Sequence, residues 1–308
     1  MNIEPLAKFW PLMYATVREI WAITEPHIED AALKNDVPME LYLYSELGLE
    51  HFSVEDFQKR DPFTNPEQFK TMFARFEIKD WIFPLQDQSY QVSLKAQEAV
   101  RDIVRAGDAQ LARFELTTDD GLIRLLLLLK QLTIANMDAQ EPPDKWAIIH
   151  RFHAADERDS VMAQIRESLM DLFAYRDDSH LSAARPHFGG AGILWDVLGA
   201  IADGSAVNAN QMAERMSLRG YEEGDYEVAI QAAVKIGWVE SSDAPNSWRP
   251  TIKGQELREE VERQTDEYFY RPWSVLARKE LDELHSLLTK LHERLAVFRL
   301  TGTGDSQS

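Results

Sequence analysis

The segment Arg176-Asp177-Asp178-x-His180 places two carboxylates between a guanidinium and an imidazole. In a pocket, such groups could act as a general acid and a general base. They could instead lie at a helix terminus, with the aspartates capping backbone N–H groups and the histidine satisfied by hydrogen bonds. We favour the structural role, because His27 holds the corresponding place 153 residues earlier and a catalytic group need not recur.

Large aromatic residues gather around the stretch that joins the two halves of the chain. They could line an apolar pocket between the halves, where ligand sites tend to lie. The commoner role of such residues is to form a core. The candidates for a ligand pocket or a polar network are His27, Trp146, Tyr175, Arg176, Asp177, Asp178, His180 and Trp195, and the ligand they would suit is small and apolar.

A metal site and a bound cofactor are not expected. His150 and His153 are spaced to share one helix face, with Asp156 and Glu157 just after them, but no third ligand is evident and surface helices carry such pairs by chance. The chain has no cysteine, which excludes thiolate ligands and disulfides. No phosphate-binding glycine loop, nucleophile elbow or zincin helix is present, so enzymatic activity is the less favoured alternative.

The chain contains one pattern twice. Residues 81–101 and 238–258 align with Trp81 on Trp238, 157 residues apart, and with Lys95 on Lys253, 158 residues apart. The one inserted residue falls where a hairpin tip would tolerate it. Self-similarity at a fixed spacing indicates two copies of one structural module.

Periodicity and turn residues predict the elements of each copy. In the second copy they predict helices over 192–202, 209–216 and 225–236, a hairpin with strands at 238–240 and 247–249, and a charged helix over 255–268. In the first copy they predict a first helix over 39–47 and a third helix over 65–78. This is the element order of a winged helix-turn-helix.

The phrase Gly237-Trp238-Val239, followed by a hairpin and then Thr251-x-Lys253-Gly254, resembles MarR-like regulators. The resemblance implies a mainly α fold with small β-hairpin wings, in which two tandem winged helix-turn-helix domains form a pseudo-dimer in one chain. The first copy has Asp80 and Ala96 where the family's phrase has glycines. The R-D-D-x-H motif resembles a bacterial family of MarR-like proteins with tandem winged helices, whose biochemical roles are mostly undefined.

Each copy is followed by an apolar helix, one over 122–135 and one with a heptad-like seam over 281–298. MarR-like proteins dimerise through terminal helices, so the two helices could pair within the chain; each could equally pack on its own domain. We expect a first winged-helix module with flanking helices over 1–140, a second over 141–300 with a dimerisation-type helix, and a disordered tail over 301–308. The resemblance implies a monomeric pseudo-dimer or a homodimer.

Charge argues against strong DNA binding. The formal net charge is −19, and winged helices need Lys and Arg on the third helix and the wing. Residues 64–81, which include the third helix of the first copy, contain three cations and three acids. Residues 222–238, which include the third helix of the second copy, contain one cation, Lys235, and four acids. The candidates for contact with duplex DNA, mainly through the first module, are Gln68, Lys70, Thr71, Arg75 and Arg249, although each could simply be solvated.

We therefore expect a MarR-like tandem winged-helix transcriptional regulator, gated by a small ligand. The alternatives are a winged-helix scaffold that binds a ligand or a protein instead of DNA, and an enzyme built on that scaffold. The first residues lack the pattern of a signal peptide, and the apolar run at Leu125–Leu129 is too short to span a bilayer, so we expect a cytoplasmic protein that does not bind membranes.

Overall fold

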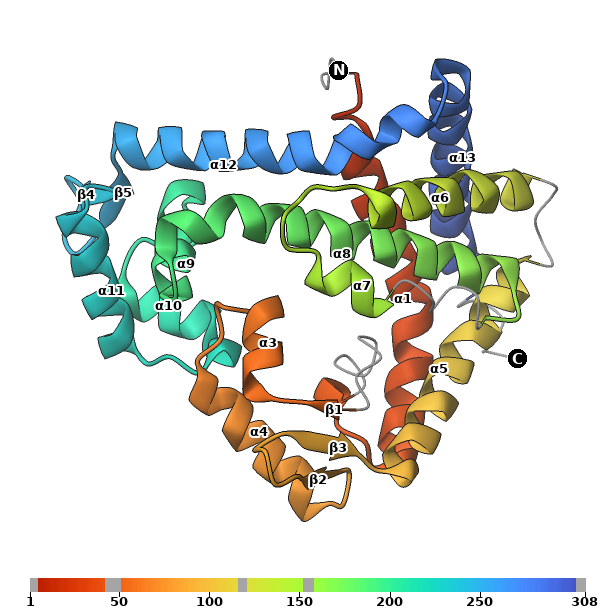
Figure 1. Cartoon of the computed structure of the whole chain (residues 1–308), viewed down its shortest axis with the longest axis horizontal. Helices are drawn as coiled ribbons and strands as arrows, with labels where there is room; N and C mark the ends of the chain where they lie inside the picture. Colours follow the sequence, from red (N-terminus) through yellow and green to blue (C-terminus); the bar gives the residue numbers. More distant parts are fainter. Residues whose placement is uncertain (1–4, 42–50, 116–120, 152–157, 303–308) are drawn as a thin grey trace. The chain divides into compact units, whose positions relative to one another are not determined.

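The computed structural model describes residues 5–41, 51–115, 121–151 and 158–302 (Figure 1). The described part is mainly helical, with one three-stranded and one two-stranded antiparallel sheet. The predicted class, mainly α with small hairpins, is confirmed. The helix expected over 39–47 lies largely outside the described residues, and Thr301 and Gly302 of the expected tail belong to a helix.

The first half of the chain begins with a long helix and continues through a small sheet to two further helices. Its elements are α1 (Phe9–Asn35), β1 (His51–Phe52), α3 (Val54–Arg60), α4 (Pro66–Ile78), β2 (Ile82–Pro84), β3 (Tyr90–Val92), α5 (Leu94–Glu115) and α6 (Gly121–Asp138). The sheet order is β1-β3-β2.

The second half begins with a short helix, continues through a long helix and three shorter ones to a hairpin, and ends with two long helices. Its elements are α7 (Trp146–Arg151), α8 (Val161–Phe188), α9 (Gly192–Asp203), α10 (Ala209–Arg215), the 3-10 turn η2 (Ser217–Arg219), α11 (Glu223–Lys235), β4 (Val239–Ser241), β5 (Trp248–Pro250), α12 (Ile252–Tyr270), the 3-10 turn η3 (Arg271–Val275) and α13 (Arg278–Gly302).

Corresponding elements recur at a nearly constant offset. Helices α4 and α11 both have 13 residues and begin 157 positions apart. Trp81 donates its backbone N–H to Phe76 at 2.9 Å, and Trp238 donates to Ala233 at the same distance, so each tryptophan closes the third helix of its copy and immediately precedes a strand. Both tryptophan side chains are buried.

Left-handed backbone conformations also recur at the repeat spacing. Positive φ occurs at Asp36 and Gly189, at Asp80 and Gly237, and at Gln88 and Asn246, pairs that lie 153, 157 and 158 residues apart. The first copy therefore keeps the turn after its third helix although it has lost the glycine. Aspartate tolerates this conformation better than most residues, because its short side chain bonds locally.

Two compact units can be separated by their internal contacts. Unit 1 is built from the described residues of Met1–Glu50, Val92–Asp178 and Asp266–Ser308, and unit 2 from His51–Gln91 and Ser179–Thr265. This division differs from two modules that meet at residue 140, and those module boundaries stay a prediction. Both small sheets lie in unit 2, apart from Val92 at the boundary.

Unit 1 is a set of long helices around one apolar core. Helix α1 packs against α5 and α13, and α6 packs against α13. Of the seam residues predicted on α13, Leu284, Leu288, Leu291 and Leu295 are buried, and Leu281 and Phe298 are partly buried. Arg124 of α6 also pairs with Glu283 of α13 at 2.8 Å. The two apolar helices that follow the two copies thus contact each other.

The left-handed turns generate a pair of opposite stability predictions. Asp80→Gly should raise the free energy of unfolding by up to about 1 kcal/mol, and Gly237→Asp should lower it by a similar amount, because only glycine adopts positive φ without cost. A Cβ at Gly237 would meet only the flexible end of Lys253 at 3.9 Å, so steric overlap should not obscure the effect. Urea unfolding measures both. Asp243→Gly, at a hairpin position with ordinary φ, is the matched control and should not stabilise.

Candidate functional site

The third helix of the first copy, α4, buries one face and exposes the other. Asn65 caps its first turn and Pro66 begins it, while Phe69, Met72, Phe73 and Phe76 lie in the core. The DNA-contact candidates Lys70, Thr71 and Arg75 are exposed on the opposite face. The Lys70 ammonium pairs with the Glu67 carboxylate at 2.7 Å, which raises the pKa of Lys70 and offsets its charge locally.

The beginning of α4 is covered by the second copy, within unit 2. The backbone N–H of Asn65 donates to the carbonyl of Arg219 at 2.9 Å, and its side-chain amide donates to the carbonyl of Gly220 at 3.2 Å. The candidate Gln68 is half-buried against this turn. A Cβ at Gly220 would lie 2.6 Å from that of Gln68, so only glycine permits the approach.

Further contacts join the same two turns. The Arg219 guanidinium pairs with Asp61 at 2.6 Å and with Asp196 at 3.3 Å, and lies 5.1 Å from the ring centroid of Phe63. Burial raises the pKa of Asp196 to about 6, although the charge of Arg219 opposes the shift. Gly192, which begins α9, lies so close to the Pro62 carbonyl that a Cβ would come within 2.1 Å of its oxygen. The turn before α4 therefore packs against the turn before α11 and against the beginning of α9.

The second copy has a groove between α10, α11 and the hairpin β4–β5, with a cavity of about 760 Å³. Carboxamides, an exposed valine and part of a tryptophan line it, together with two acids, Glu223 and Glu227. Neither acid forms an ion pair with any residue that the structure describes. The candidate Arg249 lies on the hairpin and is paired with Glu240 at 3.0 Å.

Of the R-D-D-x-H residues on α8, Arg176, Asp177 and Asp178 belong to unit 1 and His180 to unit 2. Asp178 is buried, and its two carboxylate oxygens accept the backbone N–H groups of Ala147 and Ile148 at 2.8 and 2.9 Å. It thus caps the first turn of α7, some thirty residues away in the sequence. This geometry matches the structural role that the sequence favours.

The neighbours of Asp178 are also engaged in packing. Arg176 pairs with Asp266 at 2.7 Å and lies over the ring of Trp10 at 4.5 Å. The buried Tyr175 donates its hydroxyl to the carbonyls of Glu141 and Tyr268 at 2.7 and 3.3 Å. Burial raises the pKa of Tyr175 above its ordinary value, so the hydroxyl stays protonated and remains a donor.

The remaining aromatic and histidine candidates are dispersed. His180 accepts a hydrogen bond at Nε2 from Trp195 Nε1 at 3.2 Å, inside unit 2. His27 is exposed on α1, and Asp177 is half-buried on α8. The ring of Trp146 lies 4.1 Å from that of the exposed His150. His153, Asp156 and Glu157 lie outside the described residues, and no group of three metal-ligating side chains occurs among those described.

Unit 1 contains a buried charge network that the sequence did not predict. Arg151 pairs with Glu167 at 2.8 Å and approaches Asp171 at 3.6 Å, and all three side chains are at most 4% exposed. Arg166 also pairs with Glu167, and reaches Asp108 at 3.2 Å. Burial would raise the pKa of Glu167, but the charges of Arg166, Arg151 and Arg158 outweigh it and hold that pKa below its ordinary value.

Comparison with known proteins identifies one match. A model of a helix-turn-helix family matches residues 173–299, which is less than half of the chain. The match supports a helix-turn-helix protein and is consistent with DNA-binding regulation, the usual role of such domains. No curated protein matches the chain, and neither does any solved structure. Among the described residues, none of the helices is long and apolar enough to cross a bilayer.

The capping role of Asp178 can be tested directly. Asp178→Ala should lower the free energy of unfolding by about 1–3 kcal/mol, because it strands two buried N–H donors. Native-state hydrogen exchange should show that the Ala147 and Ile148 amides lose protection before the amides of α13 do. Unchanged protection at these two amides would contradict the cap.

The network around Glu167 predicts a pH-dependent loss of stability. Because the folded-state pKa of Glu167 lies below the ordinary value of 4.5, its contribution is complete above that value and is lost as the pH falls through the folded pKa. Glu167→Gln should cost about 3–5 kcal/mol near neutral pH, since it leaves buried arginines uncompensated. The cost should shrink in acid. Urea unfolding measures the difference, and Glu98→Gln, at an exposed position of α5, should change little.

Proposed function

We propose that the chain is a tandem winged helix-turn-helix protein of MarR-like type, with the two copies arranged as a pseudo-dimer. The constant offset of α4 and α11, of the two hairpins and of the left-handed residues supports two copies of one module. The contact between α6 and α13 supports internal pairing of the terminal helices. The helix-turn-helix match supports the second copy.

We further propose that this scaffold is a protein-interaction module, which binds a cationic and partly apolar segment of a protein in the groove of the second copy. The observation that carries the proposal is the unpaired acidic face of α11. Exposed acids at Glu222, Glu223, Asp225 and Glu227 precede Val228, which is 72% exposed. A negative groove with apolar side chains attracts a basic segment and repels phosphates.

The covered start of α4 adds a second argument against duplex recognition by these helices. Recognition helices contact bases through their N-terminal residues, which must enter the major groove. At α4 those residues face Arg219 and Gly220 of the same chain. Reading DNA with the start of α4 would require the two copies to separate.

A MarR-like transcriptional regulator, gated by a small ligand, is the second candidate. One observation favours it beside the helix-turn-helix match: the exposed side of α4 carries Lys70 and Arg75, with Thr71 between them. Cations placed there could contact phosphates without entering the groove.

Titration of a fluorescent duplex separates the two candidates. At low ionic strength, which favours any electrostatic binding, we expect no change in anisotropy at micromolar protein. If binding does occur, Arg75→Gln should weaken it and reduce the salt slope by about 1, whereas Lys290→Gln on α13 should not. Binding with that pattern would reject the protein-interaction proposal in favour of the regulator.

The acidic groove can be tested with model peptides. A peptide that alternates arginine and leucine should bind the intact chain, and one that alternates glutamate and leucine should not. Replacing both Glu223 and Glu227 with Gln should weaken binding about tenfold, because two unpaired carboxylates are lost. Replacing Glu256 and Glu293, two exposed acids outside the groove, removes the same charge and should change the affinity much less. Equal loss in both pairs would show a net-charge effect and contradict the groove.

A further inference from the structure

Two carboxylates share one guanidinium where the turn before α4 meets the second copy, within unit 2. Arg219 Nη1 lies 2.6 Å from Asp61 Oδ1, and Arg219 Nε lies 3.3 Å from Asp196 Oδ2. With both acids ionised, the triad of Asp61, Arg219 and Asp196 carries one net negative charge. These side chains are 28%, 30% and 13% exposed, so water compensates that charge only in part.

The two acids of the triad differ in how their charge is stabilised. Asp61 accepts hydrogen bonds from the backbone N–H groups of Phe63 and Thr64, both at 3.2 Å, and from the Thr64 hydroxyl at 2.7 Å. Asp196 Oδ2 is buried and accepts no hydrogen bond from any described residue. A buried carboxylate without donors is costly, so a proton taken up by the triad goes to Asp196.

The charges that act on Asp196 come, among the described residues, from the other two members of the triad. Burial is the largest effect and raises the pKa of Asp196 to about 6, while Arg219 opposes the shift and Asp61 adds to it. Arg258 of α12 lies beside α9 one turn further along that helix. Arg249 of β5, which also packs against α9, is paired within its own hairpin.

Two tyrosines near the triad do not supply a compensating charge. Burial and then the charge of Asp196 raise the pKa of Tyr221, and they raise the pKa of Tyr226 to about 12, so both hydroxyls are neutral near pH 7. Asp225 adds an exposed acid at the beginning of α11. The site therefore stays negative unless Asp196 binds a proton.

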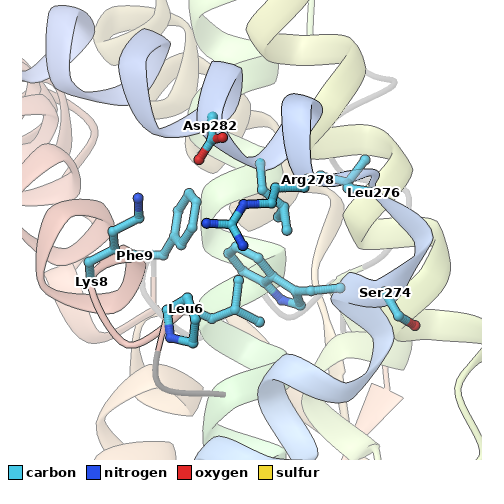
Figure 2. A pocket seen from close by; sticks show the side chains of 10 residues that line it. Leu6, Lys8, Phe9, Ser274, Leu276, Arg278 and Asp282 are labelled. Carbon is cyan, nitrogen blue, oxygen red and sulfur yellow. The ribbon is translucent and has the colours of Figure 1, made fainter. Parts of the chain in front are cut away.

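Charges that border a cavity in unit 1 show the contrast with a solvated site (Figure 2). Lys8, Arg278 and Asp282 line this cavity of about 240 Å³ and are exposed, so water stabilises their charges. Phe9 and Trp273 of its wall are fully buried and present no surface to an occupant. The triad of unit 2 lacks such exposure, and a proton is small enough to reach a carboxylate that no larger group can reach.

Asp196 is covered by the same segment that meets the start of α4. It lies near the beginning of α9, where Gly192 packs against the carbonyl of Pro62. Arg219, beside Asp196, also accepts the backbone N–H of Asn65 at 2.9 Å through its carbonyl. Separation of the turn before α4 from α9 and η2 would expose Asp196 to water. An ionised Asp196 therefore favours separation, and a neutral one favours the contact.

We propose that the triad of Asp61, Arg219 and Asp196 is an acid-responsive latch, which holds the turn before α4 against α9 and η2 while Asp196 is protonated and loosens when Asp196 ionises. Backbone hydrogen bonds form the contact, and one proton taken from water makes the triad neutral. The latch controls access to the beginning of α4, and it does not depend on a partner in the acidic groove.

Proton binding gives the latch a direction. With the turn separated, the pKa of Asp196 is close to its ordinary value of 3.8, and in the closed contact it is about 6. The proton therefore stabilises the contact fully below 3.8, and this stabilisation is lost as the pH rises through about 6. Between pH 5 and pH 7 the equilibrium constant for opening should rise about tenfold.

Hydrogen exchange at the backbone amide of Asn65, which donates across the contact, measures opening of the latch. In the native chain its protection factor should be about tenfold lower at pH 7 than at pH 5. Asp196→Asn should keep the protection high at both pH values. Asp243→Asn removes the same charge at an exposed position of the hairpin and should behave like the native chain. The same pH dependence in both variants would overturn the proposal.

Carbon-13 resonances of the aspartate carboxyl groups follow the proton directly and do not require that Asp196→Asn folds. One resonance should titrate with a pKa of about 6. Asp61→Asn should lower the midpoint of that titration, because it removes a repelling charge. Asp108 of unit 1, whose pKa burial also raises, should not respond to Asp61→Asn. A titration in which Asp61→Asn shifts no aspartate midpoint would refute the triad.

Discussion

The contact between Asn65 and the Arg219–Gly220 turn constrains what the beginnings of α4 and α11 can do. It consists of two hydrogen bonds to backbone carbonyls and of an approach that leaves no room for a Cβ at Gly220. The nearby pair between Arg219 and Asp61 is about 30% exposed on both sides, and such pairs contribute at most about 1 kcal/mol. Shape and backbone bonding therefore hold the turns together more than charge does. Since both copies belong to one chain, the contact does not depend on protein concentration.

The order of the elements from α9 to α12 could be predicted from the sequence because each of them carries its own local signal. The heptad-like spacing on α13 is readable without knowing the fold, and it appears in the structure. The shared tryptophans predict two matching hairpins. Asp80 is the instructive case, since a missing glycine weakens the sequence match while the backbone keeps its positive φ. A turn can persist in the structure after its most recognisable residue has been replaced.

Sites were harder to predict, because the relevant partners lie far apart in the chain. Asp178 caps α7 some thirty residues away, and Glu167 of α8 meets Arg151 of α7. Arginines and glutamates along a helix resemble a solvated face until their partners are known, and helical periodicity does not reveal a buried charge network. The acidic face of α11 was easier to predict, because it depends on residues that are close together in the sequence. Once Tyr226, Ile230 and Ala233 face the core, Glu227 must be exposed, while Glu222, Glu223 and Asp225 precede these residues at the beginning of the helix.

In the proposed tandem arrangement, fusion of two copies would remove a restriction that applies to a homodimer. In a symmetric dimer every substitution appears twice, so a change that suits one side must be tolerated on the other. Here the two third helices differ in charge, with exposed cations on α4 and unpaired acids on α11. A chain of this kind can give each copy a different partner, because only the surfaces that hold the copies together must remain matched.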